Sequence, residues 1–144
     1  MKIIFLGLSN KKDLLPFDEN TNPGKIINEI INKLDDECLK LNLVQYAPLD
    51  KNGKLRYPNK KEINNSIPIF LEKVKSFNPD LIIGLGNIVK NEISRIESLE
   101  NKVIFKKHPS YVFVYDRKNL NNYINDIVDD INKFRNITFF NIGN

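Results

Sequence analysis

Residues 79 to 86 read "PDLIIGLG", a short apolar run that ends in glycine. Apolar residues that do not alternate with polar ones are typical of a strand buried on both faces. The run therefore predicts a strand from Asp80 to Gly86, and the spacing of apolar residues after it predicts a helix from Asn87 to Ile96. A buried strand joined directly to a helix is the repeating unit of a parallel α/β sheet.

Three further segments have the same character as this strand, and helical patterns lie between them. The other predicted strands are Lys2 to Leu8, Leu41 to Tyr46 and Lys102 to Lys107. The other predicted helices are Gly24 to Lys40, Asn59 to Phe77 with a capping box formed by Asn59 and Glu62, and Asn119 to Phe134. This alternation predicts an α/β fold, a three-layer α/β/α sandwich around a four-stranded parallel sheet. The last stretch, Asn136 to Ile142, is interpreted either as an edge strand or as a loosely packed tail.

The composition is that of one globular domain. The chain has 144 residues, of which 41% are hydrophobic and 28% are charged, so we expect a single domain over residues 1–144. No apolar run reaches the roughly 20 residues that cross a bilayer, and the N-terminal run is too short for a signal peptide. We therefore expect a cytoplasmic protein with no membrane partner. We also expect it to be a monomer.

The chain has one cysteine, Cys38, and one histidine, His108. A single cysteine forms no internal disulfide, and these two residues cannot supply the ligands of a zinc site. We therefore expect no metal and no cofactor. Because Cys38 falls within the helix predicted from Gly24 to Lys40, we interpret it as a buried packing residue and not as a nucleophile.

Two long loops follow predicted strands, from Ser9 to Pro23 and from Ala47 to Pro58. Long loops in compact domains are often functional, and loops that follow parallel strands meet at the carboxyl edge of the sheet. His108 ends the fourth predicted strand and belongs to the same edge. Since open parallel sheets bind ligands at this edge, the sequence predicts a functional site formed by these three segments.

Three motifs lie in these segments: "GLSNKKDLLPFDENTNPGKI" at residues 7–26, "NLVQYAPLDKNGKLRYP" at 42–58 and "HPSYVFVYDRK" at 108–118. In this order, with "PDLIIGLG" between the second and the third, the chain resembles the uracil-DNA glycosylase superfamily from Met1 to about Ile131, most closely its short bacterial and archaeal members. The resemblance implies a uracil-DNA glycosylase-like fold with four parallel strands between helices. It also implies an enzyme that flips a base out of DNA and hydrolyses its N-glycosidic bond.

The resemblance assigns roles to three residues. His108 matches the histidine that donates a hydrogen bond to the base carbonyl, which stabilises the base as it leaves. Asn42 matches the asparagine that reads the pyrimidine edge, and Phe17 matches the aromatic residue that stacks on the flipped base. Each residue also has a purely structural interpretation. His108 could cap a neighbouring carbonyl, Asn42 could start the second strand, and Phe17 could pack under the first long loop.

The first motif departs from the superfamily pattern. Active members carry Asp, Glu or Asn shortly after the glycine that ends the first strand, and that residue positions or activates the attacking water. Here the residues that follow Gly7 include Ser9 and Asn10, which we take as the catalytic positions of this motif. Ser9 is a poor base at neutral pH, whereas Asn10 could orient water through its amide oxygen. Asp13 and Asp18 are the nearby carboxylates.

A net charge of +4 permits a DNA partner but does not establish one. Basic residues crowd the three motifs, and the DNA contacts that we expect are Arg56, Lys107, Ser110, Tyr111 and Arg117. A solvated, lysine-rich surface is the alternative interpretation of this charge. The segment from Tyr111 to Phe113 either takes the place of the apolar wedge that relatives insert into the base stack or forms a fifth strand.

Three functions remain open from the sequence. The first is a DNA glycosylase that acts on uracil or another altered base. The second is a catalytically weak or inactive module of the same fold that binds nucleic acid or a nucleotide, and the third is a hydrolase or transferase that acts on a free nucleoside or nucleotide. Ser9 favours the second function, whereas Asn42 and His108, together with the aromatic ring of Phe17, favour the first.

Overall fold

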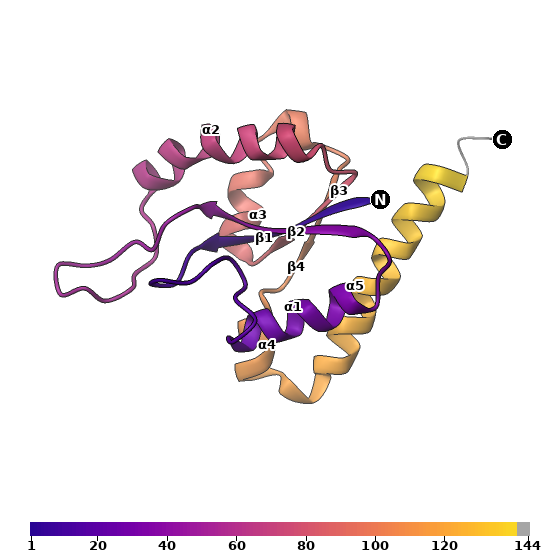
Figure 1. Cartoon of the computed structure of the whole chain (residues 1–144), viewed down its shortest axis with the longest axis horizontal. Helices are drawn as coiled ribbons and strands as arrows, with labels where there is room; N and C mark the ends of the chain where they lie inside the picture. Colours follow the sequence, from indigo (N-terminus) through magenta and orange to yellow (C-terminus); the bar gives the residue numbers. More distant parts are fainter. Residues whose placement is uncertain (141–144) are drawn as a thin grey trace.

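The computed structural model describes residues 1–140 as alternating strands and helices (Figure 1). The elements in chain order are β1 (Lys2–Ser9), α1 (Asn22–Asn32), β2 (Glu37–Val44), α2 (Lys60–Phe77), β3 (Leu81–Leu85), α3 (Asn87–Ile93), β4 (Val103–Lys106), α4 (Pro109–Tyr115) and α5 (Leu120–Arg135). All four predicted strands are present. The predicted capping box is confirmed, because the Asn59 side chain accepts from the backbone N–H of Glu62 and the Glu62 side chain accepts from that of Asn59.

The four strands form one parallel sheet in the order β2-β1-β3-β4. Strand β1 is central, and its residue Ile4 pairs with Leu39 of β2 on one side and with Ile82 of β3 on the other. The residues of β1 from Ile3 to Leu6 are 0% exposed, which explains the uninterrupted apolar run in this strand. The chain passes from β1 to β2 on one side and later to β3 on the other. The switch point of the topology therefore lies between β1 and β3.

Helices cover both faces of the sheet, which confirms the predicted three-layer α/β/α sandwich (Figure 1). On one face, Ile3 and Phe5 pack with the apolar residues of α1 and α5. On the other face, Ile4 and Leu6 pack with those of α2 and α3. Alternate residues of β1 thus point to opposite layers, as the pleat of a strand requires. None of the helices within residues 1–140 is long and apolar enough to span a membrane.

The prediction of a helix from Gly24 to Lys40 is wrong for the second half of this segment. Helix α1 ends at Asn32, and β2 begins at Glu37. Residues 37–40 pair with residues 2–5 of β1, and this pairing with a distant strand outweighs the helical spacing of their apolar side chains. Asn42 consequently lies near the carboxyl end of β2, and the interpretation that it merely starts this strand is also wrong.

Cys38 lies in β2 and not in a helix. Its half-buried thiol packs against the core and donates a weak hydrogen bond to the carbonyl of Asp36, with a distance of 3.5 Å. Burial and the nearby Asp36 carboxylate raise the pKa of the Cys38 thiol to about 11. The thiol is therefore protonated at neutral pH and is a poor nucleophile, so the role of packing residue is retained at a different place in the fold.

For two segments in the last third of the chain, one of the two alternative interpretations is wrong as well. Residues 111–113 belong to α4 and form no fifth strand, because Pro109 at the first helical position starts a helix directly after His108. Residues 136–140 form a π-helical turn that follows α5, and they form no edge strand. The remainder of that predicted segment, residues 141 and 142, lies outside the described residues.

Candidate active site

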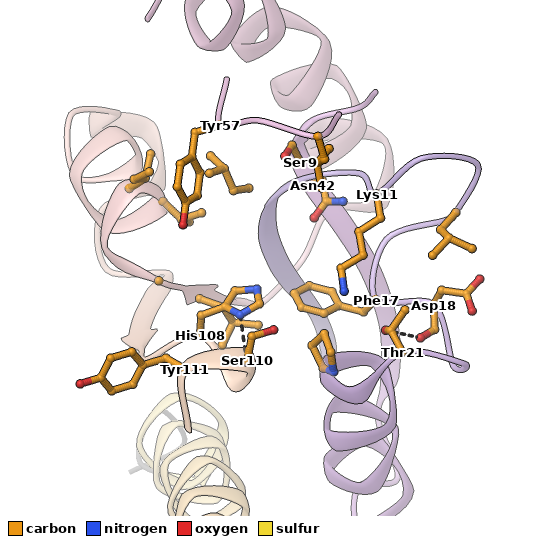
Figure 2. Close-up of a pocket in the computed structure, with 18 of the residues that line it drawn as sticks. Ser9, Lys11, Phe17, Asp18, Thr21, Asn42, Tyr57, His108, Ser110 and Tyr111 are labelled. Atoms are coloured by element: carbon orange, nitrogen blue, oxygen red, sulfur yellow. Dashed lines mark hydrogen bonds between the residues drawn. The ribbon is translucent and has the colours of Figure 1, made fainter. Parts of the chain in front are cut away.

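A cavity of about 820 Å³ opens at the carboxyl edge of the sheet, near the switch point between β1 and β3 (Figure 2). Residues from all three sequence motifs line it, together with the turn that follows β3. The lining residues with polar or aromatic side chains include Ser9, Lys11, Phe17, Asp18, Asn42, Arg56, Tyr57, Lys107, His108, Ser110 and Tyr111. The volume lies within the range of small-molecule sites, and it is large enough for a nucleobase.

His108 lies two residues after the end of β4 and forms the N-cap of α4. The backbone N–H of Ser110 donates to Nδ1 of His108 at 3.1 Å, which leaves Nε2 as the nitrogen that carries the proton in the neutral ring. Burial, and secondarily the ammonium of Lys11, lower the pKa of His108 to about 4. The imidazole is therefore neutral at pH 7, and it offers one N–H donor within the cavity.

Phe17 lies opposite His108, and the two ring centroids are 5.9 Å apart with 28° between the ring planes (Figure 2). Two glycines determine where Phe17 can lie. A Cβ at Gly7 would come within 2.9 Å of Phe17 Cζ, and a Cβ at Gly24 would come within 2.7 Å of the Phe17 carbonyl oxygen. Phe17 as a whole is only 8% exposed, and the Lys40 ammonium donates to its backbone carbonyl at 3.2 Å. Phe17 is thus held by its surroundings and also forms part of the cavity wall.

Asn42 is 4% exposed, and its amide has a fixed orientation. Its Nδ2 donates to Oδ1 of Asn10 at 2.6 Å. Within residues 1–140, Oδ1 of Asn42 accepts no hydrogen bond. Every fully buried side-chain oxygen in these residues does have a hydrogen-bond partner. The amide oxygen is therefore not fully buried, and solvent reaches it from the cavity that Asn42 lines. Asn42 can accept a hydrogen bond there and has a second N–H that can donate one.

Ser9 and Asn10 have different surroundings although they are adjacent. Ser9 ends β1 and lines the cavity. Asn10 is not among the lining residues, and its polar groups are used to join the ends of two strands. Its backbone N–H donates to the carbonyl of Tyr46, its Nδ2 donates to that of Gln45, and its Oδ1 accepts from Asn42.

Asp18 is the acidic residue among the side chains that line the cavity, and it is half-buried. Figure 2 shows its carboxylate pointing away from Phe17 and His108. Its Oδ1 accepts from the backbone N–H of Asn20, so the carboxylate stabilises the turn before α1. Asp13 does not line the cavity. Within the described part of the chain, no carboxylate therefore points between the Phe17 and His108 rings.

The comparisons with known proteins agree with this geometry. Residues 2–132 match the family model of the uracil DNA glycosylase superfamily. The chain belongs to the uracil-DNA glycosylase superfamily. Its fold is similar to the crystal structure of wild-type SMUG2 from Pedobacter heparinus, with a TM-score of 0.69 and 13% sequence identity over 94% of this chain and 76% of that chain. The sequence matches none of the curated proteins with which it was compared.

Two residues of this superfamily member line the cavity although the sequence predicted no specific role for either of them. The side chain of Lys11 runs from the end of β1 toward the Phe17 ring, and Tyr57 lies on the opposite wall above His108 (Figure 2). Tyr57 is 77% exposed and belongs to the second long loop. Nothing in the sequence distinguishes Lys11 from its neighbour Lys12, because the direction of each side chain depends on the path of the loop.

The five residues that we predicted as DNA contacts have different positions in this superfamily member. Lys107, Ser110 and Tyr111 line the cavity, and the Lys107 ammonium lies 5.7 Å from the centre of the Tyr111 ring. Arg56 also lines the cavity, but its guanidinium forms an ion pair with Glu62 at 2.6 Å and braces the second loop. Arg117 does not line the cavity, and its guanidinium stacks on the Phe113 ring at 3.9 Å.

Proposed function

We propose that this protein is a DNA glycosylase that binds a flipped uracil, or another altered base, in the cavity and hydrolyses its N-glycosidic bond. The observation that carries the proposal is that Phe17, Asn42 and His108, from three separate motifs, line one cavity. Membership of the uracil-DNA glycosylase superfamily supports the same conclusion. All three residues belong to one chain, so a monomer suffices for the proposed activity.

In this proposal, Phe17 and Asn42 bind the base. Stacking of a base on an aromatic ring contributes about 1–3 kcal/mol. Asn42 accepts from N3–H of uracil through Oδ1 and donates to O4 through the free N–H of its amide. Cytosine presents an acceptor at N3, which would face the amide oxygen of Asn42 and be repelled. The amide orientation that Asn10 holds thus favours uracil over cytosine.

His108 stabilises the leaving base in this proposal. As the N-glycosidic bond breaks, the base carries negative charge and the sugar becomes an oxocarbenium-like cation. The neutral imidazole donates from Nε2 to a base carbonyl, and this bond strengthens as the carbonyl oxygen gains charge. A donor of this kind contributes about 2.7–4 kcal/mol to the transition state.

The water-activating residue is the part of the site that differs most from the superfamily pattern. Ser9 lines the cavity but accepts no proton at neutral pH, and the Asp18 carboxylate points elsewhere. We propose that Asn10 positions Asn42 and does not position the water. Because bond cleavage is dissociative, stabilisation of the leaving base can drive the reaction with little assistance to the nucleophile.

The residues at the cavity mouth would contact DNA. Lys107 and the Ser110 hydroxyl are suited to backbone phosphates, and Tyr111 is 51% exposed on α4, where it could enter the base stack. Arg56 and Arg117, which are held by Glu62 and Phe113, would add positive potential and would make few new bonds.

The test is incubation with a uracil-containing oligonucleotide, followed by alkali, which breaks the strand at a site without a base. Wild-type protein is expected to produce scission that is lost in His108→Ala and retained in Asn122→Ala, an exposed position on α5. Circular dichroism would show that each variant is folded. Absence of scission by wild-type protein on uracil and on other altered bases would overturn the proposal.

Within residues 1–140, no carboxylate is directed into the cavity, and this observation favours a second function. An inactive module would use Phe17 and Asn42 to bind a flipped base or a nucleotide without cleaving it. The same assay separates the two functions, because such a module would give salt-sensitive DNA binding with no scission in any variant.

A further inference from the structure

One cationic side chain that lines the cavity has no role in the proposed mechanism. The cationic side chains that line it are Lys11, Arg56 and Lys107. Arg56 is paired with Glu62, and Lys107 lies over the Tyr111 ring at the mouth. Lys11 has no ion pair or side-chain hydrogen bond among residues 1–140, and Figure 2 shows its ammonium extended toward the Phe17 ring.

We propose that Lys11 is a second catalytic residue, which donates a hydrogen bond to a carbonyl oxygen of the base and stabilises the anion that leaves. This inference rests on the proposed glycosylase function. It gives the site a positive charge close to the departing base, a charge that the neutral His108 imidazole does not supply.

The position of the ammonium determines whether it would help or hinder the reaction. A cation beside the sugar would oppose the positive charge that develops there. Lys11 extends toward Phe17, the ring on which the base is proposed to stack, so it would lie on the side of the base (Figure 2). Lys11 is exposed to solvent in the free protein. A base that fills the cavity would displace water from around the ammonium and strengthen its attraction to the anion.

The test compares Lys11→Met with Lys12→Met, since Lys12 is adjacent and exposed but does not line the cavity. Single-turnover release is measured from oligonucleotides that carry uracil or 5-fluorouracil, whose anion is more stable. Lys11→Met should slow uracil release by roughly 10- to 100-fold, the contribution of one hydrogen bond to a charged group, and 5-fluorouracil release by clearly less, because a more stable anion needs less assistance. Lys12→Met should release both bases at the wild-type rate, and Lys11→Arg should recover part of the lost rate.

Two results would overturn the role of Lys11 and leave the proposed function intact. One is equal slowing of both substrates by Lys11→Met, which would indicate a general structural or DNA-binding role. The other is a wild-type rate in Lys11→Met. If wild-type protein releases neither base, the glycosylase proposal itself fails and the role of Lys11 fails with it.

A second measurement does not depend on activity. His108 is the only histidine, so its imidazole gives one set of resonances in an NMR titration. Lys11→Met should raise the pKa of His108 above its value of about 4, whereas Lys12→Met should leave it unchanged. An unchanged His108 pKa in Lys11→Met would show that the ammonium does not lie near the imidazole and would contradict the proposal.

Discussion

The rings of Phe17 and His108 lie face to face, with 5.9 Å between their centroids, although they follow strands that are not neighbours in the sheet. Phe17 is in the loop after β1, His108 comes after β4, and β3 lies between these strands. The chain leaves β3 through Gly86, whose φ of 100° is favoured by glycine, and a Cβ there would lie 3.6 Å from the His108 Cβ. The turn that follows β3 thus lies directly beside the imidazole.

Replacement of Gly7 by alanine should disable the site without unfolding the protein. The added Cβ would lie 2.5 Å from Oδ1 of Asn42 and 2.9 Å from Cζ of Phe17, so both side chains must move. We expect base release to fall at least about 10-fold, since small displacements of positioned groups are costly to catalysis. The control is Gly53→Ala, at a loop position where a Cβ meets nothing within 4 Å but φ is +78°. Gly53→Ala should lower the free energy of unfolding slightly and leave the rate of base release unchanged. Equal rates of base release in Gly7→Ala and Gly53→Ala would contradict the proposed site.

Replacement of Asn10 by alanine separates the two roles considered for this residue. If Asn10 holds the Asn42 amide, its loss allows the amide to rotate, and the selectivity for uracil over cytosine should fall by roughly 10-fold, equivalent to about one hydrogen bond. The measurement is the ratio of release rates from matched uracil and cytosine oligonucleotides. A slower reaction with unchanged selectivity would instead support the role of Asn10 in orienting water.

Gly24 should be essential to the position of Phe17. A Cβ at this residue would lie 1.8 Å from the carbonyl oxygen of Asp18, so the loop that carries Phe17 must move away from α1. We expect Gly24→Ala to lower the free energy of unfolding by about 1–3 kcal/mol and to weaken base release further than the stability loss explains. Lys25→Ala, at the next and exposed position, should change neither quantity. Wild-type stability in Gly24→Ala would show that the loop is not packed as described.

His108 should make the protein less stable in acid. Its pKa is about 4 in the folded protein, compared with an ordinary value of 6.5. Between these values the unfolded protein binds more protons than the folded protein, so the free energy of unfolding falls as the pH is lowered from about 6.5 to about 4 and this contribution levels off below. Urea denaturation at pH 7, 5.5 and 4.5 would measure it. Relative to His108→Gln, wild-type protein should lose stability across this range, and a constant difference between the two would show that the imidazole is not buried in its neutral form.

The sequence predicted the sheet because its strands are short apolar runs, which are long enough for a buried strand and too short for a buried helix. It did not predict where α1 ends, since residues 37–40 become a strand only by pairing with β1, a contact that no local pattern encodes. The helix over residues 109–115 was not predicted, because a run of aromatic and β-branched residues is typical of a strand. Pro109 was the local signal for the helix.

The site was predictable to the extent that it depends on strand ends. Asn42 and His108 lie at or after the carboxyl ends of their strands, and the loop after β1 brings Phe17 to the same edge. The directions of the Asn10 and Lys11 side chains were not predictable. They depend on a loop that contains positive φ angles at Asp13 and Phe17, neither of which is a glycine.

A crystal structure would show whether an extruded base binds among Phe17, Asn42 and His108. The ligand would be an oligonucleotide that carries 2′-fluoro-2′-deoxyuridine, in which the fluorine slows cleavage of the glycosidic bond. We expect uracil to lie on the Phe17 ring, with its N3–H and O4 on the Asn42 amide and its O2 within hydrogen-bonding distance of His108 Nε2. Uracil bound elsewhere, or a cavity that remains empty while the DNA is bound to another face, would contradict the proposed site.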